Sequence, residues 1–187
     1  MKFLPTTLPG VLVIEPDVHQ DSRGWFLETY HVTKYREGGI PEVFVQDNSS
    51  SSIKSTLRGL HCQVVRPQGK LIRVVRGEIF DVAVDIRRGS STFLSWVGVE
   101  LDETHFRQVY IPPGFAHGFC VLSEVAEVEY KCTDFYHPQG EITLRWNDPA
   151  IGVQWPVTSP LLSQKDAGAL SVAELMNQLP QLKRCSP

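Results

Sequence analysis

Short runs of alternating apolar and polar residues, separated by turn-forming residues, cover most of this chain. Alternation with period two, in runs rich in β-branched and aromatic residues, is typical of strands that bury one face. The pattern predicts strands over residues 11–14, 24–30, 43–46, 57–65, 70–75, 78–86, 93–101, 106–111, 115–122, 125–133 and 141–146. Many short strands at this spacing indicate an all-β sandwich or barrel.

Patterns typical of helices are few. One short helix is predicted over residues 32–37 and another over residues 171–179, where Ser171 can cap the helix and Glu174 can close a capping box. The serines at 49–52 are predicted to form a polar loop. Because no repeat or linker divides the sequence, we expect a single domain over residues 1–187 with a short C-terminal helical segment.

The strands predicted at 57–65 and 70–75 flank turn-forming residues at 66–69. This arrangement predicts a β-hairpin. In its simplest register, period-two alternation places His61 and Lys70 on the same face of the hairpin. An imidazole, which can act as a base near neutral pH, would then share a pocket wall with an ammonium group.

A second hairpin is predicted from residues 115–122 and 125–133, with Ser123-Glu124 as a two-residue turn. That register puts His117 opposite Tyr130 and surrounds the pair with apolar side chains. The phenol of Tyr130 could therefore donate a proton from the side opposite His61.

Composition narrows the classes of partner. The chain has 187 residues, a formal net charge of −3 and no cluster of basic residues, so we expect no nucleic-acid partner. No apolar run approaches the ~20 residues that cross a bilayer, so we expect no membrane partner. The apolar run after Met1 is too short for a signal peptide, and we expect a cytoplasmic location.

The cysteines do not form a disulfide pattern. Cys62, Cys120, Cys132 and Cys185 show neither paired spacing nor a Cys-x-x-Cys motif. We expect those within apolar strands to be buried thiols.

Several motifs, in order from about residue 10 to residue 166, resemble the dTDP-4-dehydrorhamnose 3,5-epimerases. The clearest are Leu57-Arg58-Gly59-Leu60-His61 and Pro112-Pro113-Gly114-Phe115-Ala116-His117, and the others lie at residues 21–28, 46–48, 69–71, 81–85, 130–131, 146–149 and 162–166. The resemblance implies a cupin-type jelly-roll β-sandwich that forms a homodimer by exchanging N-terminal strands. It implies conversion of dTDP-4-dehydro-6-deoxy-D-glucose to dTDP-4-dehydro-L-rhamnose without a metal or other cofactor.

The candidate catalytic residues suit that reaction. Removing a weakly acidic hydrogen next to a ketone requires a base, a group that stabilises the enolate oxygen, and an acid on the other face of the sugar. The resemblance assigns His61 as the base, oriented by Asp166. It assigns Tyr130 as the acid and places Lys70 near the C4 oxygen.

The resemblance also assigns nucleotide contacts. Arg23 and Arg58 correspond to diphosphate ligands, and Phe26 and Tyr136 correspond to aromatic residues that sandwich thymine. Further substrate-contacting positions are Glu28, Gln46, Asp47, Asn48, His117, Glu141 and Lys165. Of these residues, the partner subunit is expected to supply Arg23, Phe26 and Glu28.

This chain departs from its relatives at a few positions. Ser49 stands where relatives often have histidine, Cys62 where they often have tyrosine, and Ser55-Thr56 where they often have glycine and valine. Each departure could alter sugar or base preference without removing a candidate catalytic group.

Three other functions fit parts of the sequence. Epimerisation at C5 alone or C3 alone would need the same base, acid and cation. A metal-dependent cupin would use His117 in its second motif, but residues 61–63 read His-Cys-Gln where a metal site would add a carboxylate. A non-catalytic sugar-nucleotide binding module would need the arginines and aromatics but not the acid and base.

Overall fold

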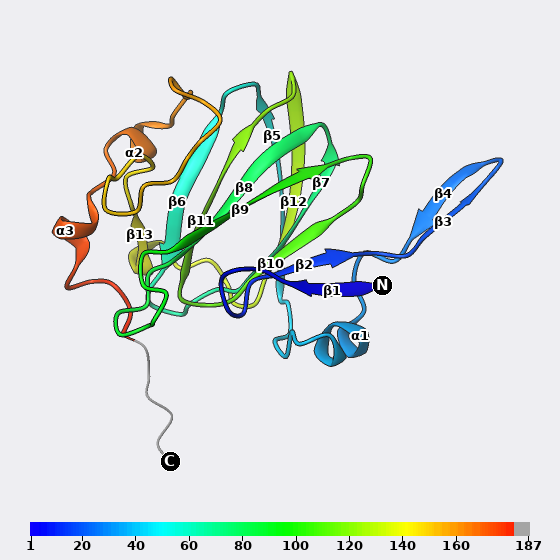
Figure 1. Ribbon diagram of the computed structural model, residues 1–187, viewed down its shortest axis with the longest axis horizontal. Coiled ribbons are helices and arrows are strands. Elements are labelled where there is room, and N and C mark those ends of the chain that lie inside the picture. The colour runs from blue at the N-terminus through cyan, green and yellow to red at the C-terminus, as the bar shows by residue number, and fades with distance from the viewer. Residues whose placement is uncertain (182–187) are drawn as a thin grey trace, which may run out of the picture.

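Two antiparallel sheets, stacked face to face, form the body of the computed structural model, which describes residues 1–181 (Figure 1). Within those residues the larger sheet has the strand order β1-β2-β10-β7-β12-β5, and the smaller has the order β13-β6-β11-β8-β9. The strands of the larger sheet are β1 (Lys2–Pro5), β2 (Leu12–Glu15), β5 (Gln46–Ile53), β7 (Lys70–Arg76), β10 (Gln108–Ile111) and β12 (Val125–Cys132). The strands of the smaller sheet are β6 (Leu57–Gln63), β8 (Glu78–Asp85), β9 (Trp96–Asp102), β11 (Phe115–Val121) and β13 (Glu141–Thr143).

Helices are short in the described part of the chain. They are α1 (Val32–Glu37), the 3-10 helix η1 (Pro138–Gly140), α2 (Gln164–Ala167) and α3 (Val172–Leu175). None of the helices within residues 1–181 has the length and apolar character needed to cross a membrane. The all-β jelly roll with few short helices that the sequence predicted is therefore confirmed.

The main core lies between the two sheets, because each sheet turns its apolar alternate residues inward. Ile72 and Val74 from β7 pack there with Ala83 from β8 and Phe119 from β11. A second apolar cluster lies where the C-terminal segment covers the outer face of the smaller sheet, and Val172 and Leu175 of α3 are part of it. These clusters leave one end of the sandwich free for polar side chains.

The predicted helices are observed. Helix α1 has the predicted bounds. Helix α3 begins at the predicted cap, where Ser171 and Glu174 form the capping box, and it ends earlier than predicted. Residues 182–187 lie outside the described residues, so Cys185 and the last part of the predicted domain are not assessed.

The predicted polar loop at residues 49–52 is wrong, because these serines lie within β5. Every residue of β5 from Gln46 to Ile53 pairs with β12. Pairing along a whole neighbouring strand outweighs the weak preference of serine for strands. The sequence prediction also missed β1, β3 (Val18–Asp21) and α2.

Both predicted hairpins are wrong. Strand β6 pairs with β11 and β13, whereas β7 pairs with β10 and β12 in the other sheet. Strands β11 and β12 also lie in different sheets, so residues 123–124 connect the two layers. Turn-forming residues do not distinguish a hairpin from a crossing between stacked sheets, because both need only a change of chain direction.

Strands β3 and β4 (Gly24–Leu27) form a two-stranded ribbon that projects away from the sandwich (Figure 1). Its side chains are exposed along most of both strands, including Phe26, which is 70% exposed. Trp25 contacts Phe106, with ring centroids 4.6 Å apart. An apolar ribbon with this exposure is an unusual feature for an isolated chain.

Candidate active site

An irregularity in β6 aims Arg58 and His61 at the same space. Arg58 pairs with Phe119 of β11 and His61 pairs with His117, so two residues of β6 face one residue of β11 between these pairs. In a regular strand, residues three positions apart such as Arg58 and His61 point to opposite faces. The extra residue in β6 changes the alternation, so that both side chains point to the same face.

Gly59 is required at this irregularity. Its φ is +135°, and a Cβ built there would lie 2.6 Å from the Cα of Gly118 and 2.9 Å from the carbonyl oxygen of His117. Both contacts are with backbone, which cannot move aside as a flexible side chain can. The close approach of β6 to β11 therefore depends on glycine.

His61 bonds to a buried carboxylate. Its Nε2 lies 2.6 Å from Oδ1 of Asp166, which is 3% exposed, and Ser163 donates its hydroxyl to the other carboxylate oxygen at 2.8 Å. Burial alone would raise the pKa of Asp166, but the hydrogen bonds from His61 and Ser163 outweigh it and lower this pKa. Because an ionised carboxylate only accepts hydrogen bonds, His61 Nε2 carries a hydrogen and Nδ1 is left as the basic nitrogen.

Helix α2 places Asp166 in this position. Ser163 is its N-cap and accepts the backbone N–H of Asp166, so one side chain both starts the helix and bonds the carboxylate. The Ser-x-x-Asp pattern is typical of a helix cap, whereas the contact with His61 was expected only from the family resemblance. A cavity of about 400 Å³ opens here, lined by Thr56, Leu57, Arg58, His61, Leu161, Leu162, Ser163, Lys165 and Asp166.

The larger sheet supplies the opposite side of the site. Lys70 pairs with Cys132 across β7 and β12, and its Nζ lies 5.9 Å from the centre of the Tyr130 ring. Burial raises the pKa of Tyr130, so its hydroxyl stays protonated near neutral pH. His61 and Lys70 thus lie in different sheets, so the prediction that they share one face of a hairpin is wrong.

A second histidine–carboxylate pair lies deeper in the site. His117 Nε2 is 2.7 Å from Oδ2 of Asp81, and both side chains are buried. Burial lowers the pKa of His117, opposed by Asp81 and assisted by the nearby charges of Lys70 and His61. The sequence analysis did not single out Asp81, since a lone acid in an apolar strand has no distinguishing pattern.

Polar side chains surround Tyr136 at the entrance of the site. The Tyr136 hydroxyl donates to Oε2 of Glu141 at 2.9 Å, and Lys165 Nζ lies 2.5 Å from the same oxygen. Burial would raise the pKa of Glu141, but the hydrogen bonds from Lys165 and Tyr136 lower it overall. Glu141 therefore stays ionised and holds an exposed aromatic ring at its hydroxyl end.

Some predicted site residues lie elsewhere. Arg23 is paired with Asp21 in the projecting ribbon, where Phe26 is also located, and Glu28 bonds to Lys34. The three residues assigned to the partner subunit are therefore not brought into the site of their own chain.

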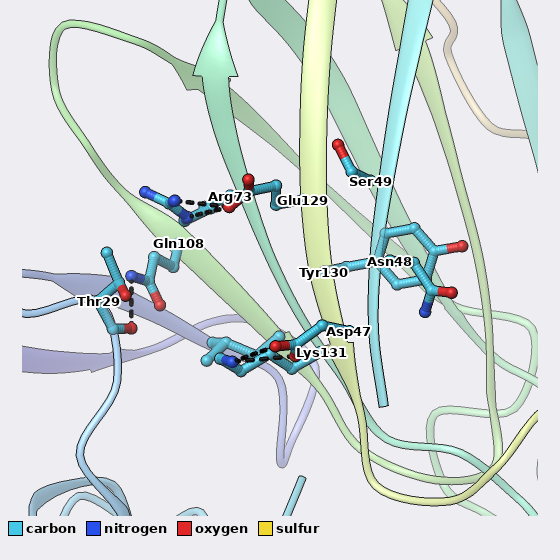
Figure 2. A pocket seen from close by; sticks show the side chains of 10 residues that line it. Thr29, Asp47, Asn48, Ser49, Arg73, Gln108, Glu129, Tyr130 and Lys131 are labelled. Atoms are coloured by element: carbon cyan, nitrogen blue, oxygen red, sulfur yellow. Dashed lines mark hydrogen bonds and ion pairs between the residues drawn. The ribbon is translucent and has the colours of Figure 1, made fainter. Parts of the chain in front are cut away.

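Asp47 is on the outer face of the larger sheet. It bonds to Lys131 beside a hollow of about 260 Å³ that also contains the Arg73–Glu129 ion pair (Figure 2). Asn48 and Tyr130 are also among the residues that line this hollow (Figure 2). Ser49 also lines this outer hollow.

The cysteines of the described residues are buried thiols, as predicted. Cys62, Cys120 and Cys132 are free. Cys62 packs in the apolar cluster beneath the C-terminal segment, and burial raises the pKa of its thiol to about 12. The Cys62 thiol is therefore protonated and unreactive near neutral pH.

Comparisons with known proteins identify the family to which this chain is similar. The family model described as dTDP-4-dehydrorhamnose 3,5-epimerase matches residues 5–174. Proteins with that name from Pseudomonas aeruginosa and Neisseria gonorrhoeae are each 50% identical to this chain, over 176 and 190 residues. The alignments cover 93% of this chain and 97% of the Pseudomonas protein, and 100% of this chain but 58% of the Neisseria protein.

A solved structure of a similar protein has the same fold as this chain. The Legionella pneumophila dTDP-6-deoxy-D-glucose-3,5-epimerase, in complex with dTDP-4-keto-L-rhamnose, superposes with a TM-score of 0.95 and 46% identity. The match covers 98% of this chain and 99% of the Legionella chain.

Proposed function

The chain belongs to the dTDP-4-dehydrorhamnose 3,5-epimerase family, and on this basis we propose that it converts dTDP-4-dehydro-6-deoxy-D-glucose to dTDP-4-dehydro-L-rhamnose. The observation that carries the proposal is His61 of the smaller sheet, bonded to Asp166 of α2, together with the neighbouring Tyr130 and Lys70 of the larger sheet. A base and an acid on opposite walls are what inversion of a carbon requires.

His61 Nδ1 takes the proton from the carbon next to the ketone. The electrons of the broken C–H bond move to the C4 oxygen, where the Lys70 ammonium stabilises the enolate. Asp166 stabilises the imidazolium that forms, in the same way that a buried carboxylate supports other catalytic histidines. Tyr130 then gives its hydroxyl proton to the opposite face of the carbon, and solvent restores both groups to their starting protonation states.

Binding of the nucleotide uses the entrance of the site. Arg58 lines the cavity beside His61, and its planar guanidinium suits a diphosphate. We assign the exposed ring of Tyr136 to thymine, and His117, Asn48 and Lys165 to contacts with the sugar and phosphates. Gln46 and Glu141 hold Tyr136 in place through its N–H and hydroxyl.

Hydrogen exchange in heavy water tests this function. Given dTDP-4-dehydro-6-deoxyglucose in D₂O, the protein should incorporate deuterium at C3 and C5, observed by proton NMR as loss of both signals. Exchange at one carbon alone would show a C3-only or C5-only epimerase. If neither carbon exchanges while dTDP still binds, the chain is a binding module and the epimerase proposal fails.

The projecting β3–β4 ribbon supports a homodimer with exchanged strands. Arg23 is 87% exposed and Phe26 is 70% exposed, although the resemblance places both in the nucleotide site. A second copy would cover the apolar ribbon and complete each site with the partner's Arg23.

Mixing of two inactive variants tests the exchange of strands. Arg23→Ala and His61→Ala subunits, refolded together after mild denaturation, should regain activity, because a heterodimer holds one site with both defects and one with neither. If heterodimers form and no activity returns, Arg23 serves its own chain. The predictions of a cytoplasmic location and of cofactor independence can be tested by cell fractionation and by elemental analysis of active protein.

A further inference from the structure

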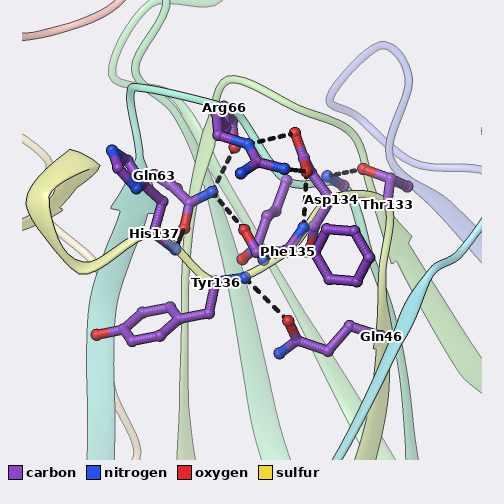
Figure 3. Close-up of polar contacts among 10 residues, drawn as sticks. Gln46, Gln63, Arg66, Thr133, Asp134, Phe135, Tyr136 and His137 are labelled. Atoms are coloured by element: carbon purple, nitrogen blue, oxygen red, sulfur yellow. Dashed lines mark hydrogen bonds and ion pairs between the residues drawn. The ribbon is translucent and has the colours of Figure 1, made fainter.

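The loop between β12 and η1, residues 133–137, carries Tyr136 across one end of the sandwich (Figure 3). The loop has no regular secondary structure, and the side chains of Phe135 and Tyr136 are 55% and 53% exposed. Neither ring can be fixed by burial. The position of the Tyr136 ring therefore depends on how the loop backbone is held.

Gln63, at the end of β6, holds this backbone. Its Nε2 donates to the carbonyl oxygens of Arg66 at 2.5 Å and Phe135 at 3.1 Å, and its Oε1 accepts the N–H of His137 at 2.8 Å. The Gln63 side chain is 6% exposed, so few water molecules can replace these partners. One buried amide thus bonds the backbone on both sides of Tyr136 (Figure 3).

Residues from both sheets hold Tyr136 itself. Oε1 of Gln46 in β5 accepts the N–H of Tyr136 at 2.9 Å, and Glu141 accepts its hydroxyl. Glu141 is also the residue that pairs with Gln63 between β13 and β6. Gln63 is therefore at the junction of the strand that bears the candidate base, the strand that bears Glu141, and the loop.

Only an amide suits the position of Gln63. The side chain must donate two hydrogen bonds and accept one, and among uncharged side chains of this length only glutamine can do so. A carboxylate would face two carbonyl oxygens and repel them. A methionine side chain of similar size would leave the two carbonyl groups and one N–H without partners.

We propose that Gln63 is a positioning residue for nucleotide recognition, which fixes the 133–137 loop so that Tyr136 presents its ring to the base. The proposal rests on the proposed function and deepens it, because it separates recognition of the base from recognition of the diphosphate. Gln63 lies two residues from His61 on the same strand, but it makes none of the bonds that orient His61. Its loss should weaken base binding and leave the proton-transfer groups in place.

The test compares Gln63→Met with the wild-type protein by calorimetry, using dTDP and inorganic pyrophosphate as probes. We expect Gln63→Met to bind dTDP roughly tenfold more weakly, since a freed loop must be ordered on binding, and to bind pyrophosphate unchanged. KM for the dTDP-sugar should rise by a similar factor, with kcat within about twofold.

Ser123→Ala is the matched control. Ser123 lies at the opposite end of β12, where its hydroxyl accepts the N–H of Glu78 at 2.9 Å and donates to the carbonyl oxygen of Val125 at 2.8 Å. This variant also loses internal hydrogen bonds, so it reports the effect of lower stability alone. It should leave both affinities unchanged.

Gln63→Asn gives a second test if Gln63→Met does not fold. It keeps the amide, but its side chain is one methylene too short to bond both Arg66 and the 133–137 loop. Equal weakening of dTDP and pyrophosphate, or unchanged dTDP affinity in a folded Gln63 variant, would overturn the proposal. Failure of the wild-type protein to exchange substrate hydrogens would instead refute the proposed function, and the dTDP comparison would still be valid.

Discussion

Replacing Asp166 by Asn would remove one charge from the candidate site with little change in shape. The amide oxygen can still accept the hydrogen on His61 Nε2, and the amide nitrogen can face the Ser163 hydroxyl, which then acts as acceptor. The backbone bond from residue 166 to Ser163 also remains. The variant therefore tests whether the carboxylate charge, and not only its position, supports proton abstraction.

The geometry gives the expected size of the effect. The centres of the imidazolium and carboxylate charges lie roughly 4 Å apart, and their attraction at an effective dielectric constant near 20 is about 4 kcal/mol. His61 is 24% exposed, so solvent screening reduces this to roughly half. A loss of about 2 kcal/mol from a transition state with imidazolium character lowers the rate by about 30-fold.

The assay is the rate of deuterium incorporation at C3 and C5, followed by NMR at saturating substrate. We expect Asp166→Asn to lower this rate by about 30-fold, with dTDP affinity unchanged, since Asp166 supports the base and not the nucleotide. Glu124→Gln is the control, because it removes a carboxylate from the exposed Lys54–Glu124 ion pair. An Asp166→Asn exchange rate within threefold of wild type would refute the role of the charge.

Other substitutions test separate parts of the structure. Tyr130→Phe should reduce net inversion more than hydrogen exchange, because His61 can still remove the proton; equal losses in the NMR assay would mean that Tyr130 is not the acid alone. Gly59→Ala should cost at least about 2 kcal/mol of unfolding free energy in urea melts, because its Cβ would meet backbone, whereas Gly152→Ala, which has space for a Cβ, should cost about 1 kcal/mol. Burial favours a raised pKa for Asp85, but hydrogen bonds from Arg87, Ser90 and Thr92 bring it to about 2. This lowered pKa contributes about 2 kcal/mol of stability above pH 4 that is lost as pH falls towards 2; Asp85→Asn should flatten that part of the acid unfolding curve, and a slope equal to wild type would contradict the assignment.

The sequence predicted the fold class and most strands, because period-two alternation is a local property that each strand carries by itself. It did not predict which strands pair. Residues 64–69 and 123–124 look like hairpin turns, yet each connects one sheet to the other. Pairing depends on the whole set of strands, and β6 finds its partner β11 more than fifty positions along the chain.

An incorrect strand pairing need not separate candidate residues in space. A crossing between stacked sheets, like a hairpin, brings the ends of successive strands to the same end of the molecule. His61 and Lys70, near the two ends of one crossing, therefore lie in different sheets, and the charges of both act on His117.

The residues that orient the candidate catalytic groups could not be predicted from local sequence patterns. Asp81 gains its importance from His117, 36 positions away, and Gln63 from its bonds to Phe135 and His137, 72 and 74 positions away. The irregularity at Gly59 is similar, because it is visible only when the registers of β6 and β11 are compared. Chemistry-bearing side chains can be recognised from sequence by type and spacing, whereas the hydrogen bonds that orient them are set by tertiary contacts. Substitutions at these supporting residues should therefore separate binding from catalysis more cleanly than substitutions of the catalytic groups.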